Sequence, residues 1–171
     1  MDRKSVWVVV LAVAALAAAL AMGACGGTAS ADSGSFGSGG SSHALQGTTV
    51  NGDSFELTSG SGKPTVVNFF ASWCGPCNNE AGDLAAFAAA HPDVQMVGVA
   101  VNDQQPDTLA FVTKYGLHYP VVMDPNGSIA ADWGVSPIPH TFFVDKSGKV
   151  QTSIVGSATL AQFEQDLKSI Q

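Results

Sequence analysis

The feature that most constrains the fold is an apolar run that leads into two cysteines and then into an alanine-rich segment. The run "KPTVVNFFAS", residues 63–72, is rich in β-forming side chains and predicts a central strand with apolar residues on both faces. Cys74 and Cys77 follow, separated by two residues. The segment that begins at Pro76 is rich in alanine, has Leu84 and Phe87 three residues apart and stops before Pro92, which predicts a helix. The cysteines are therefore expected where a strand passes into a helix.

The rest of the chain alternates between strand and helix patterns and predicts an α/β fold. Strands alternating with helices favour a central sheet covered on both faces, and two strands joined by a tight turn require an antiparallel pair, so the sheet is expected to be mixed. The predicted elements are a hairpin around Asn51-Gly52, a strand over 94–101, a helix over 106–116, a strand over 119–124, a short helix over 127–134, two strands within 140–155 and a helix over 159–170.

Several apolar residues are expected to serve only the core. The last predicted helix begins with Thr159 and Gln162 at capping-box spacing. Its apolar residues form one helical stripe, and three aromatic residues elsewhere occupy positions typical of a core. These residues are Leu160, Phe163, Leu167, Ile170, Trp133, Phe142 and Phe143.

The N-terminus resembles a bacterial lipoprotein export signal. Arg3 and Lys4 precede an uncharged apolar run over 6–22, and small residues then lead to Cys25. The resemblance implies a signal peptide over 1–24, lipid on the Cys25 thiol and attachment to the outer face of the bacterial cell membrane. The alternative is an uncleaved anchor, because the run is just long enough for a marginal membrane span. In either case the domain is expected outside the cytoplasm, where disulfides persist.

Composition separates a tether from a domain and excludes one class of partner. The segment 25–43 consists largely of Gly, Ser, Ala and Thr after Cys25 and predicts a flexible tether, while 44–171 has the length of one ordinary domain. Without residues 1–24 the chain keeps 5 basic and 13 acidic residues, a formal charge of −8. Because no basic patch is present to neutralise phosphates, nucleic-acid binding is not expected.

The spacing of Cys74 and Cys77 favours redox chemistry over metal, heme or purely structural roles. A structural zinc site needs four ligands, and only one Cys-x-x-Cys pair is present, so His118 and His140 would have to complete it. A c-type heme site needs histidine after the second cysteine, where Asn78 stands. A disulfide that closes so short a loop removes little entropy from the unfolded chain. We therefore expect a redox-active disulfide and no other cofactor.

The start of a helix suits the chemistry of thiol exchange. Unpaired backbone N–H groups and the positive end of the helix dipole favour a thiolate at Cys74. Cys77 lies one turn further on and is expected to be more enclosed. Pro76 suits the first turn because its missing N–H has no helical partner there, and Gly75 allows another backbone to approach the sulfur.

The same residues resemble the thioredoxin superfamily. "VVNFFASWCGPC" looks like its active-site strand and helix start, and "GVSPIPHTFFVDKSGKV" is similar to its cis-proline stretch with the hairpin that follows. The "FFVD-x-x-G-K" ending, the additional helix and strand between Gln104 and Asp124 and the lipoprotein-type start resemble the TlpA/ResA/DsbE branch. The likeness implies a thioredoxin-like fold over nearly the whole domain.

The resemblance also implies roles for individual residues. Cys74 would attack a substrate and Cys77 would resolve the mixed disulfide, with Trp73 as the aromatic flank of the site. Pro139 would be the cis-proline, and Ile138 would offer backbone hydrogen bonds to a substrate strand. The alternative is that Pro137 and Pro139 only delimit a strand.

Three positions need separate interpretation. Asn68 stands where thioredoxin itself has a buried aspartate, and it agrees with the TlpA-like branch. That branch often has a carboxylate at the position of Glu80, which would accept or relay the proton of Cys77; the alternative is a first-turn acid that only stabilises the helix N-terminus. His140 stands where threonine is common. It is either a cation near Cys74 or, as the preferred interpretation, an exposed loop histidine.

The leading hypothesis is a membrane-tethered thiol–disulfide oxidoreductase that exchanges disulfides with exported proteins. The resemblance favours a reductant, with the heme-attachment cysteines of cytochromes c as one class of substrate and a membrane electron-donor or acceptor protein as its redox partner. An oxidant role, a peroxidase and a non-enzymatic lipoprotein that binds a ligand or a metal such as copper are the alternatives. The peroxidase is disfavoured because Ala71 occupies the position where peroxiredoxins have threonine or serine.

Overall fold

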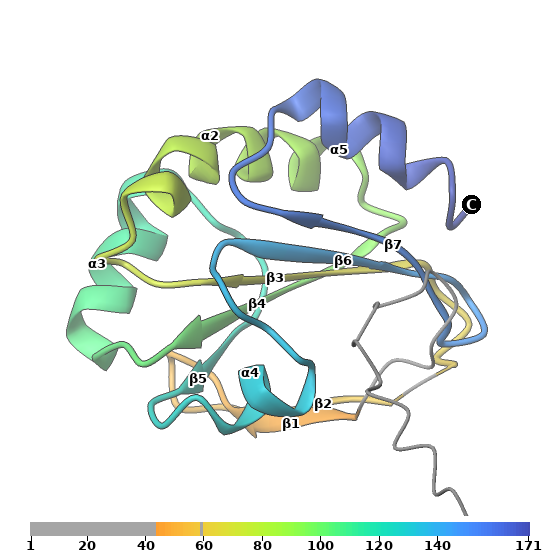
Figure 1. Ribbon diagram of the computed structural model, residues 1–171. Helices are drawn as coiled ribbons and strands as arrows, with labels where there is room; N and C mark the ends of the chain where they lie inside the picture. The colour runs from red at the N-terminus through yellow and green to blue at the C-terminus, as the bar shows by residue number, and fades with distance from the viewer. Residues whose placement is uncertain (1–43, 59) are drawn as a thin grey trace, which may run out of the picture. The chain divides into compact units, whose positions relative to one another are not determined.

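The computed structural model describes residues 44–58 and 60–171. Within these residues, strands and helices follow one another in the order that the sequence predicts (Figure 1). The elements are β1 (Leu45–Thr48), β2 (Ser54–Leu57), β3 (Thr65–Phe70), α2 (Gly75–Ala90), β4 (Gln95–Val101), α3 (Gln105–Tyr115), β5 (Val121–Asp124), α4 (Ser128–Asp132), β6 (His140–Val144), β7 (Val150–Val155) and α5 (Leu160–Leu167).

Five of the strands form one mixed sheet in the order β5-β4-β3-β6-β7. The strands β3, β4 and β5 run parallel, whereas β6 pairs antiparallel with β3 and β7 antiparallel with β6. Strands β1 and β2 form a separate antiparallel hairpin. The fold is thioredoxin-like, as the sequence predicts.

Strand β3 lies at the centre of the sheet and determines where the cysteines lie. All six of its residues are buried, which confirms the prediction of a strand covered on both faces. Alternate residues along a strand face opposite sides of a sheet. Phe69 therefore belongs to one core cluster and Phe70 to another. The chain leaves the carboxyl end of β3 and reaches Cys74 within four residues.

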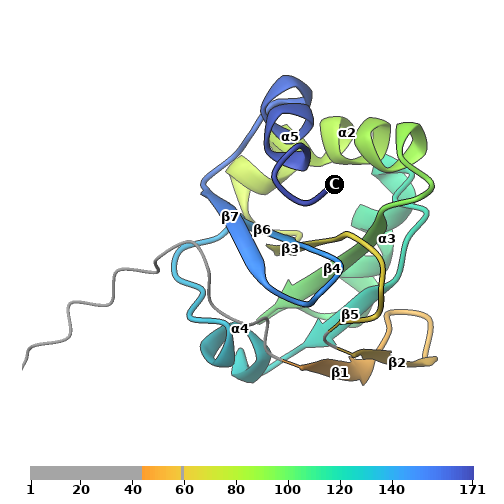
Figure 2. The same cartoon turned by 90° about the vertical axis from the view of Figure 1, so that its right-hand side faces the viewer.

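The two faces of the sheet are covered differently. Helices α2, α3 and α5 cover one face, and α4 together with the β1–β2 hairpin covers the other (Figures 1 and 2). Phe70 stacks on Phe111 of α3, while Phe69 packs against Trp133 and Phe142 on the opposite side. The aromatic residues and the α5 stripe predicted as core are buried or packed against the core, as expected.

The ends of the helices follow the local sequence signals. Cys74 is the N-cap of α2, and a proline stands in the first turn of both α2 and α3. Gly116 ends α3 in the left-handed conformation, with φ 66°, which favours glycine. Thr159 and Gln162 form the predicted capping box at the start of α5.

The hairpin is joined to the edge of the main sheet. The Val50 N–H donates to the Val121 carbonyl at 2.8 Å, and Thr49 forms an isolated bridge with Val122. A Cβ atom at Gly47 would lie 2.7 Å from a methyl group of Val122, so only glycine allows this close approach. The contact covers β5, which would otherwise present an open edge.

The predictions for the N-terminal part lie outside the described residues. They include the signal peptide over 1–24, the lipid on Cys25 and the tether over 25–43. Among the residues that the structure describes, no helix has the length and apolar character needed to span a bilayer.

Candidate active site

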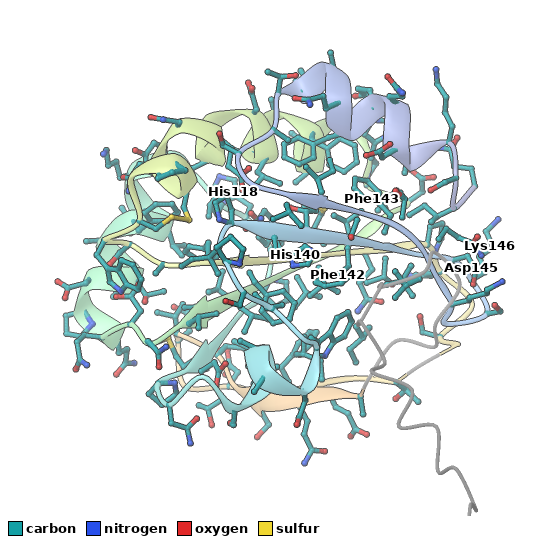
Figure 3. The ribbon with its side chains drawn as sticks, in the orientation of Figure 1. His118, His140, Phe142, Phe143, Asp145 and Lys146 are labelled. Atoms are coloured by element: carbon teal, nitrogen blue, oxygen red, sulfur yellow. A yellow bond between two sulfur atoms is a disulfide. The ribbon has the colours of Figure 1, made fainter. Side chains whose placement is uncertain are left out.

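The first turn of α2 carries a disulfide between Cys74 and Cys77 (the yellow bond in Figure 3). Their Cα atoms are 5.2 Å apart, one helical turn along the chain. Cys74 is 6 % exposed and Cys77 is 1 % exposed. The order of exposure agrees with the prediction, because the thiol further along the helix is the more enclosed one.

The helix start places hydrogen-bond donors and dipoles around the outer sulfur. The Cys77 backbone N–H donates to Sγ of Cys74 at 3.2 Å, as an N-cap side chain accepts from the first turn. The carbonyl oxygen of Ile138 lies 3.9 Å from the same sulfur. A negative charge on Sγ of Cys74 would be stabilised by the N–H group and by the helix dipole, so the geometry favours a thiolate after reduction.

The segment before β6 faces the disulfide and contains the predicted cis-proline. The Ile138–Pro139 peptide bond is cis, and so is Ser136–Pro137, which the sequence analysis did not anticipate. The Pro139 carbonyl accepts a hydrogen bond from Gly156 N–H at 2.9 Å, which ties this segment to the end of β7. Pro139 itself is buried.

An open groove of about 500 Å³ runs beside the disulfide. It brings together Trp73, Gly75, Pro76 and Ile138, four of the five residues predicted to bind substrate, whereas Pro139 lies outside the lining. Trp73, which is 64 % exposed, lies at the edge of the groove. A Cβ atom at Gly75 would meet nothing within 4 Å, so the glycine leaves open space next to Cys74. The full lining is Trp73, Cys74, Gly75, Pro76, Val101, Asn102, Val135, Ser136, Pro137 and Ile138, none of which carries a charged side chain.

Asp103 supports the loop that carries the cysteines, and the sequence analysis missed it. Its carboxylate accepts from the Ser72 N–H at 2.7 Å, the Ser72 hydroxyl at 2.8 Å and the Gln104 N–H at 2.9 Å. The Trp73 indole donates to the neighbouring Asn102 carbonyl at 3.2 Å. The sequence contained a signal for this contact, because Asp103 follows strand β4 and the carboxyl ends of adjacent parallel strands meet at one edge of the sheet.

Glu80 lies behind the disulfide, buried in the centre of the domain. It is 1 % exposed. Asn68 of β3 donates to its Oε1 at 3.0 Å, and the Ala158 N–H donates to its Oε2 at 2.9 Å. Asn68 also donates to Thr141 of β6 at 2.9 Å. Glu80 therefore connects α2, the central strand and the segment before α5, which differs from the alternative of a first-turn acid at the helix end.

Burial raises the pKa of Glu80 from its ordinary value of 4.5 to about 7. Desolvation of the carboxylate is the main cause, and the charge of Asp83 adds to it, while the hydrogen bonds from Ala158 and Asn68 lower the pKa. A carboxyl group with a pKa near neutrality is suited to accept and release protons at physiological pH.

The interpretations of His140 need correction. His140 is the first residue of β6 and is 5 % exposed, so it is not an exposed loop histidine. Its ring stacks on Phe142 at a centroid distance of 4.1 Å, and Figure 3 shows both residues together. Burial lowers the pKa of His140, which favours the neutral imidazole and opposes the alternative of a cation near Cys74. The error arose because the strand begins immediately after Pro139.

The disulfide also bears on the zinc alternative. The sulfur atoms of Cys74 and Cys77 are bonded to each other. His140 packs in the core, whereas His118 is exposed. Across residues 44–58 and 60–171, no group of three or more His, Cys, Asp or Glu side chains is arranged to hold a metal ion.

A disulfide at the start of α2 in a thioredoxin-like fold defines the class of thiol–disulfide oxidoreductases. Residues 41–153 match the family model described as AhpC/TSA family. The chain is 34% identical over 125 residues to the thiol-disulfide oxidoreductase ResA of Bacillus anthracis, covering 72% of each chain.

Comparison with solved structures also places the chain among thiol–disulfide oxidoreductases. One is MTB DsbF, with a TM-score of 0.70, 34% identity and coverage of 74% of this chain and 95% of that one. Another is a secreted disulfide oxidoreductase of Mycobacterium tuberculosis described as homologous to E. coli DsbE, with a TM-score of 0.69, 30% identity and coverage of 74% and 96%. The chain belongs to the AhpC/TSA family and, within it, to the ResA/DsbE-like thiol–disulfide oxidoreductases.

The raised pKa of Glu80 predicts a specific pH dependence of stability. Between about pH 4.5 and 7 the folded, oxidised protein keeps the Glu80 proton and the unfolded chain does not, so the free energy of unfolding should fall as pH rises through this window. The shift corresponds to at most about 3 kcal/mol. In Glu80→Gln this pH-dependent part of the free energy of unfolding should be absent, as measured by urea unfolding from pH 4.5 to 7.5.

The matched control is Glu56→Gln, which replaces an exposed carboxylate on β2 and should leave the pH slope of the wild type unchanged. Equal slopes in the wild type and in Glu80→Gln would contradict the assignment.

Proposed function

We propose that this oxidoreductase is tethered to the outer face of the bacterial membrane and reduces disulfides of exported proteins, the heme-attachment cysteines of cytochromes c among them. The observation that carries the proposal is the uncharged groove at the disulfide, in which Cys74 and Ile138 stand side by side. Such a groove suits a polypeptide segment bound through its backbone and apolar side chains, because no lining charge selects a charged small molecule.

The proposed reaction starts from the reduced pair. The Cys74 thiolate attacks one sulfur of a substrate disulfide, and the other substrate sulfur leaves as a thiolate. Cys77 then attacks Sγ of Cys74, which re-forms the Cys74–Cys77 disulfide and releases the second substrate sulfur. The substrate gains two electrons and two protons in total. A membrane electron-donor protein would return the pair to the dithiol state.

Glu80 is proposed to accept the proton of Cys77 during the second attack. It lies three residues after Cys77 on α2, and both side chains are 1 % exposed. A buried thiol needs a nearby proton acceptor, since the thiolate and not the thiol is the nucleophile. The pKa of about 7 leaves a substantial fraction of Glu80 ionised at neutral pH and ready to accept.

Two further residues of the groove have proposed roles in substrate binding. Trp73 offers an exposed apolar surface beside Cys74, and the Ile138 backbone offers hydrogen bonds to an extended segment. Gly75 and Pro76 leave the approach to the sulfur open. Attachment through Cys25 and the extracytoplasmic location rest on the lipoprotein-type start. The description of the Mycobacterium tuberculosis relative as secreted supports the extracytoplasmic location alone.

The assignment of the attacking thiol can be tested by trapping. In the Cys77→Ala variant the mixed disulfide on Cys74 should persist, because the resolving thiol is missing, and non-reducing gels should show adducts with exported proteins. Cys74→Ala is the matched control and should form none. Adducts with Cys74→Ala alone would reverse the assignment, and adducts restricted to cytoplasmic proteins would contradict the proposed substrates.

The direction of the reaction can be tested by the equilibrium reduction potential of the Cys74–Cys77 pair against glutathione or dithiothreitol. A reductant should have a potential near that of thioredoxin, about −270 mV, whereas a value near that of DsbA, about −120 mV, would indicate an oxidant. Reduction of insulin by the wild type, and not by Cys74→Ser, should accompany the low potential.

The tether can be tested in cells. Cys25→Ser should prevent incorporation of radiolabelled fatty acid and move the protein from the membrane fraction to the soluble extracytoplasmic fraction. Ser42→Ala, a substitution elsewhere in the N-terminal part, is the control and should leave both unchanged. If Cys25→Ser stays in the membrane fraction, the retained apolar run over 6–22 is the anchor instead.

A further inference from the structure

Asn78, the residue after Cys77, forms three side-chain hydrogen bonds at the start of α2 that the proposed reaction does not yet involve. Its amide nitrogen donates to the Ser72 carbonyl and to the Cys74 carbonyl, each at 2.9 Å. Its amide oxygen accepts from the Tyr115 hydroxyl of α3, also at 2.9 Å. Both N–H groups of the amide and its oxygen therefore have partners.

The three partners fix the orientation of this amide. Asn78 lies one helical turn after Cys74 on the same face of α2, so its short side chain reaches back to the loop before the helix. A rotated amide would place its oxygen against two carbonyl oxygens, which repel it. The amide nitrogen of Asn78 thus ties together the two residues on either side of Trp73.

The same loop is held on its other side by residues that follow β4. The Asp103 carboxylate accepts from the Ser72 N–H at 2.7 Å and from the Ser72 hydroxyl at 2.8 Å. The Asn102 carbonyl accepts from the Trp73 indole at 3.2 Å. Asp103 therefore takes up the donors of Ser72, while Asn78 serves its acceptor. Loss of the Asn78 amide would release the loop on the side of α2 alone.

Tyr115 connects the Asn78 amide to the core. Its ring lies 4.7 Å from that of Phe111 between centroids, and Phe111 stacks on Phe70 at 4.9 Å. Phe70 is the last residue of β3, the strand that leads into the cysteine loop. The Lys114 ammonium lies 4.5 Å from the centroid of the Tyr115 ring. The Tyr115 hydroxyl is thus held beside the first turn of α2, next to which α3 lies (Figure 1).

The contacts of Asn78 matter most when the disulfide is open. In the oxidised protein a covalent bond joins the sulfur atoms of Cys74 and Cys77. That bond is absent in the dithiol and in the mixed disulfide, where noncovalent contacts must keep Cys74 over α2. The described ones include the Cys77 N–H to Sγ of Cys74 at 3.2 Å and the Asn78 N–H to the Cys74 carbonyl at 3.1 Å. The Asn78 side chain adds the contacts that a substitution can remove.

We propose that Asn78, held by Tyr115, is the positioning residue that keeps a mixed disulfide on Cys74 within reach of Cys77. The inference rests on the proposed order of attack, in which Cys77 resolves the intermediate formed on Cys74. In that step the proton of Cys77 passes to Glu80, and the Cys77 thiolate forms a bond to Sγ of Cys74. The bond between Cys74 and the substrate sulfur breaks, and the substrate leaves as a thiolate.

The rate of this step depends on alignment. Attack within one molecule is fast only while the two sulfurs stay close and correctly oriented, because a fixed geometry replaces a chance encounter. Asn78 contributes to that geometry from α2, and Tyr115 contributes from α3 through Asn78. Helix α3 thereby supports the exchange without touching the substrate.

Asn78→Leu tests the inference because leucine has a similar shape and lacks the donors and the acceptor. Reduced protein is mixed by stopped flow with the symmetrical disulfide of thionitrobenzoate, whose thiolate is coloured. Attack by Cys74 releases one thiolate at a rate proportional to the concentration of the reagent. Resolution by Cys77 releases the second at a rate independent of that concentration, and Cys77→Ala should show the first release alone.

The resolution rate should fall about tenfold in Asn78→Leu, as expected for the loss of two hydrogen bonds. The attack rate requires Cys74 alone and should fall less. A resolution rate equal to that of the wild type overturns the inference. An equal fall in both rates also overturns it, because a general loosening of the site would slow both steps alike.

Asn79→Leu is the matched control. Asn79 is the next residue of the same helical turn and is exposed, and within residues 44–58 and 60–171 its side chain forms no hydrogen bond. Its replacement should leave both rates at their wild-type values. A fall in the resolution rate equal to that of Asn78→Leu would mean that any leucine in this turn slows the step, which contradicts the inference.

Tyr115→Phe keeps the test decisive if Asn78→Leu folds poorly. The substitution removes the hydroxyl that holds the Asn78 amide and keeps the ring beside Phe111. The resolution rate should fall by about threefold. In the double variant with Asn78→Leu it should fall no further than in Asn78→Leu, because Tyr115 acts through Asn78. An unchanged rate in Tyr115→Phe, or additive effects in the double variant, overturns the inference.

The probe separates this inference from the proposed function, because it does not depend on the natural substrate or on the direction of the reaction. If the wild type resolves the probe and Asn78→Leu resolves it equally fast, only the inference fails. If the wild type shows no second release, Cys77 is not the resolving thiol, and the proposed reaction fails together with the inference. A reduction potential typical of an oxidant would overturn the reducing direction, while slower resolution in Asn78→Leu would still support the inference.

Discussion

The buried carboxylate of Glu80 is the interaction on which the organisation of the site depends. It joins helix α2 to Asn68 of the central strand and to the backbone of Ala158 before α5. Burying a carboxylate is costly unless donors face it, and here two donors face it while desolvation still raises its pKa to about 7. One group therefore fixes the helix that carries the cysteines and remains able to exchange a proton. The hydrogen bonds from Asn68 and Ala158 therefore both hold the helix in place and help to set the pKa of Glu80.

The outer half of the site is built from the carboxyl ends of the parallel strands. Strand β3 delivers the cysteine loop, and β4 delivers Asp103, whose carboxylate accepts the Ser72 backbone and side chain. Residues 135–138 line the groove from the side of β6, and the carbonyl of the adjacent Pro139 accepts a hydrogen bond from the Gly156 N–H at the end of β7. Rigid elements thus hold Cys74 at the edge of an uncharged groove, where a substrate segment can reach it.

Local signals predicted much of this arrangement. The apolar run before Cys74, the proline in the first turn and the capping box at Thr159 each describe their own neighbourhood, and each is found in the structure. The environment of His140 was predicted wrongly because a single polar residue after Pro139 carries no information about which strands flank it. Asp103 was missed because its partner, Ser72, lies 31 residues away along the chain.

The sequence by itself determined the order of strands and helices and the pair of thiols at a helix start, because periodicity, caps and the spacing of two cysteines act over one or two turns of chain. Tertiary structure alone decided the protonation chemistry behind those thiols. The pKa of Glu80 depends on how far water is excluded and on which donors arrive from β3 and from Ala158. Water exclusion is a property of the packed domain, and no stretch of the chain possesses it before the sheet and its helices come together.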